Sequence, residues 1–134
     1  MGLVKTILRF ADGRVLKGFT EGFDPRRASF LFQESGGVLT DRWQEMQLQG
    51  LKAICFVKDF AGNPLYDERS NFEKEQKIQG RRMQVTFRDG EKILGFAIRN
   101  DVSRPGFYLF PADLKSNNFG VFVILDAVHD IWFL

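Results

Sequence analysis

The sequence predicts an all-β protein built from two tandem small five-stranded barrels that pack together, with little helix. The chain matches itself without a gap when Val4 is aligned with Arg81 and Val57 with Leu134, and 11 of the 54 aligned positions are identical. Both aligned segments carry an Asp-Gly dipeptide between short apolar runs, which is typical of a β-hairpin. Hydrophobic residues make up 44% of the 134 residues, which favours a packed core over disorder.

The identical positions are concentrated at glycines and large apolar residues. They include Asp24, Arg27 and Phe30, which align with Asp101, Arg104 and Phe107. Because glycine is favoured where φ is positive or where chains approach closely, shared glycines indicate shared backbone constraints. We therefore divide the chain into a first barrel at 1–57, a linker at 58–80 and a second barrel at 81–134.

Each aligned segment is expected to form five strands in the same order. An Asp-Gly type I′ turn separates the first two strands, and an interior glycine at position 18 or 95 predicts a bend or a bulge in the second. The expected strands are 6–10, 15–19, 30–32, 44–48 and 52–57 in the first unit, and 83–87, 93–96, 107–110, 120–125 and 129–134 in the second. The linker holds Phe60, Leu65, Tyr66 and Phe72, so we expect it to lie against the barrels.

Composition limits the classes of function. The net charge is +2 and spreads evenly along the chain, so bulk electrostatics does not favour nucleic-acid binding. No apolar run approaches the roughly 18 residues of a membrane span, and the N-terminus lacks the apolar stretch of a secretory signal. A single cysteine suits a reducing compartment, so we expect a cytoplasmic protein.

No catalytic constellation is visible in the sequence. His129 is the only histidine, which excludes Ser-His, Cys-His and multi-histidine sites within one chain. Cys55 lies in a predicted strand without a neighbouring histidine, and the carboxylates are scattered or occupy turns. We therefore expect neither an enzyme nor a metal or cofactor site.

One resemblance supports the barrel prediction. The hairpin, the Gly-Phe pair and the series Asp101, Arg104, Phe107 and Leu109 resemble the first motif of Sm-like proteins, which implies a small SH3-like or Sm-like barrel. The RNA-contacting asparagine of that motif would fall at Pro105-Gly106 or at Ala28-Ser29, and neither position offers it. Sm-like nucleic-acid binding is therefore kept only as an alternative.

A second resemblance covers nearly the whole chain. Three sequence segments, at 104–113, 116–118 and 56–64, carry this resemblance. They resemble an uncharacterised bacterial family of tandem small β-domains that occurs in signalling proteins, sometimes alongside PilZ domains. That resemblance implies a regulatory context without an activity.

The PilZ context suggests a nucleotide site. PilZ receptors bind cyclic di-GMP through an arginine arm and an Asp/Asn-x-Ser-x-x-Gly turn, and this chain has Asp101, Ser103 and Gly106 in that pattern, with Arg81 and Arg82 upstream. The candidate ligand-binding residues of a degenerate PilZ-like receptor are Arg81, Arg82, Asp101, Ser103 and Arg104. Asp101 and Arg104 also align with Asp24 and Arg27, and we favour loop closure as the role of both pairs.

The favoured function is a non-enzymatic binding or adaptor module that docks a protein partner in bacterial signalling or regulation. Its candidate partner-binding residues are Asn117, Asn118 and Trp132. Trp132 aligns with Cys55, so the second unit presents a larger apolar side chain at this position. Self-association into a homo-oligomer is left open.

Overall fold

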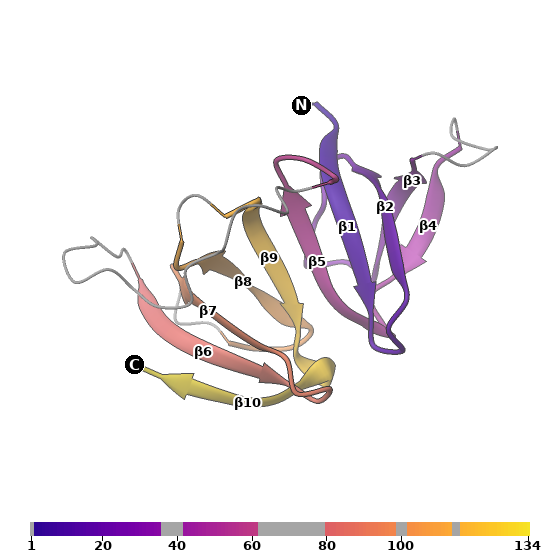
Figure 1. Ribbon diagram of the computed structural model, residues 1–134. Helices are drawn as coiled ribbons and strands as arrows, with labels where there is room; N and C mark the ends of the chain where they lie inside the picture. Colours follow the sequence, from indigo (N-terminus) through magenta and orange to yellow (C-terminus); the bar gives the residue numbers. More distant parts are fainter. Residues whose placement is uncertain (1, 36–41, 62–79, 99–101, 114–115) are drawn as a thin grey trace.

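A computed structural model describes residues 2–35, 42–61, 80–98, 102–113 and 116–134 (Figure 1). The described chain is all-β, as predicted: ten strands, all paired antiparallel, and one 3-10 helix, η1 (Leu125–Ala127). The strands are β1 (Val4–Phe10), β2 (Val15–Thr20), β3 (Ser29–Glu34), β4 (Gln44–Gln47), β5 (Leu51–Val57), β6 (Arg81–Phe87), β7 (Lys92–Ala97), β8 (Gly106–Pro111), β9 (Asn118–Ile124) and β10 (Val128–Phe133). No described helix is long and apolar enough to cross a membrane.

The strand bounds follow the self-alignment of the sequence. The alignment that places Val4 on Arg81 also places β1, β2 and β3 on β6, β7 and β8, with both ends of each strand in agreement. Within the first half the spatial order is β5-β1-β2-β3-β4, and within the second it is β10-β6-β7-β8-β9. If the five strands of each half are numbered in chain order, both halves have the spatial order 5-1-2-3-4.

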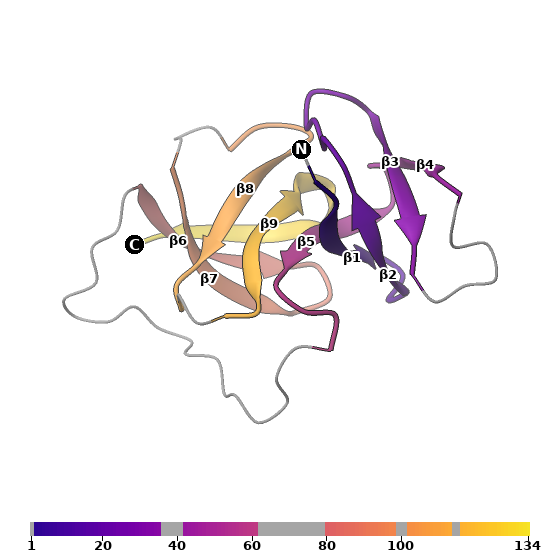
Figure 2. The same ribbon diagram turned by 90° about the horizontal axis from the view of Figure 1, so that it is seen from above.

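The expectation of two small five-stranded SH3-like or Sm-like barrels is not confirmed, because the strands form one ten-stranded sheet that is not closed into a barrel. In neither half do the fourth and fifth strands pair with each other in the described residues. β5 pairs instead with β9 of the other half, from Ala53 opposite Val123 to Val57 opposite Asn118. A strand has two edges, and β5 uses one for β1 and the other for β9, so none remains to close the first half on β4. Figures 1 and 2 both show β5 and β9 side by side where the halves join.

Two hydrophobic cores lie on either side of this join, and each draws side chains from both halves. The core of the first half includes Phe122 and Ile124 of β9. The core of the second half includes Ala53, Cys55 and Val57 of β5. A strand buried on both faces needs apolar residues at successive positions, which explains why β5 reads as an almost continuous apolar run. Neither half therefore completes its core alone.

The Asp-Gly hairpins form where they were predicted, but the turn type differs. Gly13 and Gly90 have φ values of 96° and 94°, whereas no described non-glycine residue has a positive φ. A type I′ turn needs positive φ at both central residues, and Asp12 and Asp89 do not provide it. In each hairpin a type I turn is followed by a glycine in the left-handed region, and the Gly13 amide donates to the Phe10 carbonyl.

The interior glycine at position 18 is required by close approach of two strands. A Cβ atom added to Gly18 would lie 2.1 Å from the carbonyl oxygen of Gln33 on β3. The predicted bend is thus a place where β2 and β3 come close together.

Only the start of the expected linker can be compared with the prediction. Phe60 packs against the second core, and its ring meets Phe19 edge-on at 5.3 Å. The other three apolar linker residues, Leu65, Tyr66 and Phe72, lie outside the described residues.

Candidate protein-docking edge

The sheet ends on two strands whose outer edges pair with no described strand, β10 at one end and β4 at the other. Such an edge presents a row of backbone N–H and C=O groups that another chain can pair with. The two edge strands lie at opposite ends of the sheet order, and Figure 1 shows β4 at the right and β10 along the lower left.

The side chains of the two edges differ. On and after β10, Trp132 is 63% exposed, Phe133 46% and Leu134 65%. β4 has only four residues, Gln-Glu-Met-Gln, three of them polar and exposed. Short strands and charged side chains weaken pairing at a sheet edge, as on β4, and β10 lacks both along its last residues. The outer edge of β10 is therefore the candidate docking site.

Two local contacts orient the exposed rings of β10. The Arg81 guanidinium lies over the Phe133 ring, 4.2 Å from its centroid. The Trp132 indole Nε1 donates a hydrogen bond of 2.5 Å to Oδ2 of Asp130. Because these contacts restrict the side chains before binding, less rotamer entropy is lost when a partner covers them.

A hollow of about 560 Å³ lies at the C-terminal end of β10. It is lined by Gly80, Arg81, Arg82, Ala97, Ile98 and Leu134. Ile98 is 61% exposed and Leu134 65%, so the hollow combines apolar surface with two guanidinium groups.

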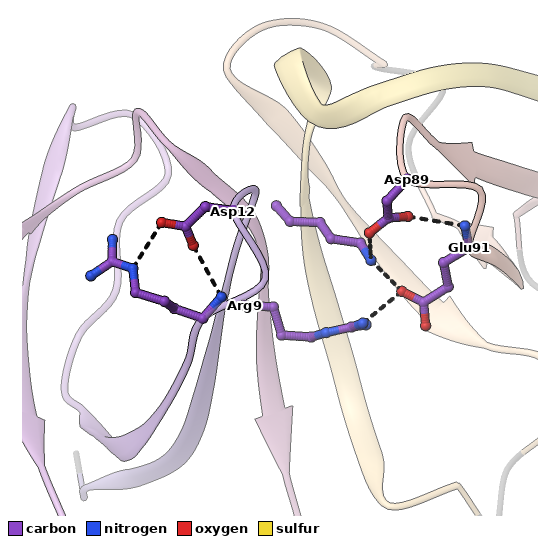
Figure 3. Close-up of polar contacts among 6 residues, drawn as sticks. Arg9, Asp12, Asp89 and Glu91 are labelled. Atoms are coloured by element: carbon purple, nitrogen blue, oxygen red, sulfur yellow. Dashed lines mark hydrogen bonds and ion pairs between the residues drawn. The ribbon is translucent and has the colours of Figure 1, made fainter.

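At the join of the halves lies an ionic cluster of Arg9, Lys52, Asp89 and Glu91 (Figure 3). Lys52 of β5 is only 5% exposed, and its Nζ lies 2.6 Å from Oδ2 of Asp89 and 2.5 Å from Oε1 of Glu91. The same Glu91 oxygen accepts a 2.7 Å hydrogen bond from Arg9. The cluster ties β1 and β5 to the second Asp-Gly hairpin. Sequence reasoning missed it, although a lysine inside the apolar run of β5 was a signal, since a buried charge needs a partner.

The cluster shifts the pKa values of its members. Burial opposes ionisation of Glu91, but hydrogen bonds from Arg9 and Lys52 outweigh burial and lower its pKa. The hydrogen bond from Lys52 also lowers the pKa of Asp89. Burial likewise opposes the charge on Arg9, and the bond to Glu91 outweighs it and raises the pKa of Arg9. All three groups are thus held in their charged forms.

The surroundings of Cys55 disfavour thiol chemistry. Cys55 is 6% exposed, and burial raises the pKa of its thiol to about 11, which disfavours the nucleophilic thiolate. His129 is exposed on β10. No group of three His, Cys, Asp or Glu side chains in the described ranges could hold a metal ion.

The structure separates the residues of the predicted nucleotide site. Arg104 forms an ion pair with Asp126 of η1, and Arg88, just after β6, donates to the Asp126 carbonyl oxygen. Arg81 begins β6, and the length of that strand separates its Cα from that of Arg88 by about 20 Å. Ser103 adjoins Arg104, Arg82 adjoins Arg81, and Asp101 lies outside the described residues. The arginine arm and the turn are therefore not brought together.

The aligned loop in the first half is closed by its aspartate. Asp24 accepts hydrogen bonds from the Arg26 amide and guanidinium, while Arg27 lies 4.0 Å away. Arg104 turns to Asp126, so the two arginines of the aligned pair have different partners.

The three predicted partner-binding residues have different surroundings. The Asn117 amide bonds the backbone of Asp59, donating to its carbonyl at 2.8 Å and accepting from its N–H at 3.1 Å. Asn118 pairs with Val57 in the β5–β9 ladder. Both asparagines thus contribute to the join of the halves, whereas Trp132 lies on the candidate edge.

The fold and the site define an all-β protein with a continuous sheet and one exposed apolar strand edge. A family model described as a family of unknown function, DUF6982, matches residues 3–134, and the chain belongs to this family. No curated protein and no solved structure matches the chain.

Proposed function

We propose that this protein is a non-enzymatic binding module that docks a protein partner by adding a strand of that partner to the outer edge of β10. The observation that carries the proposal is the unpaired edge of β10 with Trp132, Phe133 and Leu134 exposed along it. Main-chain hydrogen bonds give affinity in strand addition, and pockets for alternate side chains give specificity.

The chain itself contains an example of this kind of docking. β5 is the last strand of the first half, as β10 is of the second, and it holds β9 along five paired residues. We infer that the halves are copies of one unit, each an incomplete barrel that accepts a strand from outside. The matching strand bounds and the common strand order support this inference.

Affinity capture from a lysate of the source cells tests the proposal. Trp132→Lys places a charge on the edge and should abolish capture of the partner, because the partner strand would bury that charge. Leu31→Lys is the matched control, since Leu31 is 56% exposed on β3, away from β10. Equal capture by wild type and by Trp132→Lys would refute docking at this edge.

A further inference from the structure

The contact between the halves predicts what occupies the edge of β10. β5 and β10 are equivalent in position, and β4 is equivalent to residues 121–124 of β9. β5 and β9 pair with each other, whereas the outer edges of β10 and β4 pair with no described strand. We propose that β10 of one molecule pairs with β4 of a second copy, in the antiparallel register that β5 and β9 use. This inference rests on the proposed function, since it names the strand that β10 accepts.

The register follows from the self-alignment of the chain. Within the chain, Ala53, Ile54, Cys55 and Phe56 lie opposite Val123, Phe122, Val121 and Gly120. Replacing each residue by its equivalent in the other half places Asp130, Ile131, Trp132 and Phe133 opposite Met46, Glu45, Gln44 and Trp43 of the second copy.

This register brings together two exposed rings. Trp43, just before β4, is 38% exposed, and Phe133 is 46% exposed. They become a directly opposed pair, and aromatic pairs across strands stabilise a sheet. Each edge thus carries an aromatic residue that the other covers.

The exposure of Trp132 has the same explanation. Cys55, its equivalent, is buried because β5 borders the core of the next half. Trp132 is exposed because the outer edge of β10 pairs with no described strand. In the proposed contact it covers the first core of the second copy beside Met46, which is only half-buried on β4.

The contact between copies is weaker than the contact within the chain. β4 has Glu45 and Gln47 where β9 has Phe122 and Ile124, so less apolar surface is buried. The ionic cluster is also incomplete. His129 stands at the position of Lys52, and Arg14, which pairs with Asp12, stands at that of Glu91. Association is therefore reversible and depends on concentration.

The two edges belong to opposite ends of the sheet (Figure 1), so the contact is heterologous. A heterologous contact leaves a free edge on each terminal molecule and repeats until a ring closes or a filament grows. Assembly consequently passes beyond a dimer.

Blocking one edge at a time tests this geometry by sedimentation velocity. Wild type should gain mass beyond a dimer as concentration rises. Leu3→Lys should behave in the same way, since Leu3 is 52% exposed and precedes β1, which pairs with β2 and β5 and with neither edge strand. Trp43→Lys blocks β4 and Trp132→Lys blocks β10, so each variant alone should remain a monomer. An equimolar mixture of the two should stop at a dimer, because one intact β10 meets one intact β4. A wild-type monomer at every concentration, or a dimer of Trp43→Lys alone through two β10 edges, would overturn the proposal.

Disulfide cross-linking tests the register independently of those variants. Met46→Cys and Asp130→Cys are placed in separate chains, one of them carrying a size tag. Directly opposed residues have Cα atoms about 4.5–5.5 Å apart, within the range of a disulfide, whereas a Gln44→Cys partner lies diagonally at about 7–8 Å. We expect the mixed disulfide with Met46→Cys and little with Gln44→Cys, while wild type controls for the buried Cys55. Equal yields, or no cross-link with Met46→Cys, would overturn the register.

Failure of this inference can be separated from failure of the proposed function. If the purified chain stays monomeric while capture of a different protein is lost in Trp132→Lys, the occupant is not a second copy and docking at β10 stands. If Trp132→Lys changes neither self-association nor capture, both proposals are wrong.

Discussion

Lys52 of the first half and Glu91 of the second form a 2.5 Å ion pair across the join of the two halves. The Lys52 side chain is 6% exposed and that of Glu91 37%, so the pair lies at the rim of the shared interior. Its neighbours Arg9 and Asp89 extend it into a cluster of two cations and two carboxylates.

Lys52→Ala should lower the free energy of unfolding by about 2 kcal/mol, because Asp89 and Glu91 lose their shared donor and Phe87 loses its contact with the ammonium group. Arg9 still bonds Glu91, which keeps the loss below that of a fully isolated buried charge. Chemical denaturation measures the change, and Lys92→Ala, at an exposed position on β7, is the matched control. Equal stability of the two variants would contradict a structural role for the cluster.

The contribution of Glu91 should depend on pH. Its pKa in the folded protein lies below the ordinary value of 4.5, so its stabilising effect is complete above that value and is lost as the pH falls through the folded pKa. Wild type should therefore exceed Glu91→Gln in stability by a constant amount at neutral pH and by progressively less below about pH 4.5. Denaturation of both proteins across the acid range measures this difference. A difference that does not shrink in acid would mean that the charge on Glu91 contributes nothing.

Cys55 should report on opening of the join. Burial raises the pKa of its thiol to about 11, so at pH 8 the thiolate is more than ~100-fold rarer than for a free cysteine, and the side chain is also covered by the second core. Labelling by a thiol reagent should accordingly be more than ~100-fold slower in the folded protein than in denaturant. Lys52→Ala should accelerate labelling, because it weakens the join. Fast labelling of the folded wild type would place Cys55 at the surface.

Replacing Gly13 or Gly90 by Val should cost more than about 1 kcal/mol, because a β-branched residue resists the positive φ that both positions adopt. No atom lies within 4 Å of a Cβ built at either position, so the cost arises from the backbone and not from a clash. Melting temperatures measure the effect. Gly2→Val is the control, since its added Cβ also meets open space and its φ is not positive. Unchanged melting in both turn variants would refute the turn geometry.

The local features of the fold could be predicted from the sequence. The positions of the strands, to within about two residues at each end, and the two Asp-Gly hairpins depend on neighbouring residues, whose periodicity and glycine content are visible in a single chain. The interior Gly18 was expected to mark a bend or a bulge, and the structure shows there a close approach of two strands. Trp132 is exposed on the last strand, while its role in binding a partner stays a prediction. The turn type was not predicted, since Asp-Gly fits both a type I′ turn and a type I turn followed by a left-handed glycine.

The separation of Arg81 from Arg104 illustrates what a motif leaves undetermined. The two lie 23 positions apart in the sequence, and the match to the PilZ pattern suggested a common site. In the second half, Arg104 instead pairs with Asp126, which lies beyond the C-terminal end of β6. Arg81 lies at the other end of that strand. Spacing in sequence fixes neither the direction of a strand nor the end at which a loop lies.

By itself, the sequence determined which segments become strands and which faces are apolar, because these depend on local periodicity and turn chemistry. Only the tertiary structure decided how the strands join. The edge of β5 could have closed its own half on β4 or paired with β9, and the apolar surface of Phe122 and Ile124 favours β9 over the polar β4. This choice is a competition between a neighbouring segment and one in the other half of the chain. The pairing partner of β5 depends on the apolar area buried on both faces of the paired strands and on the ion pairing of Lys52 with the second hairpin. No local sequence pattern specifies either of these contributions.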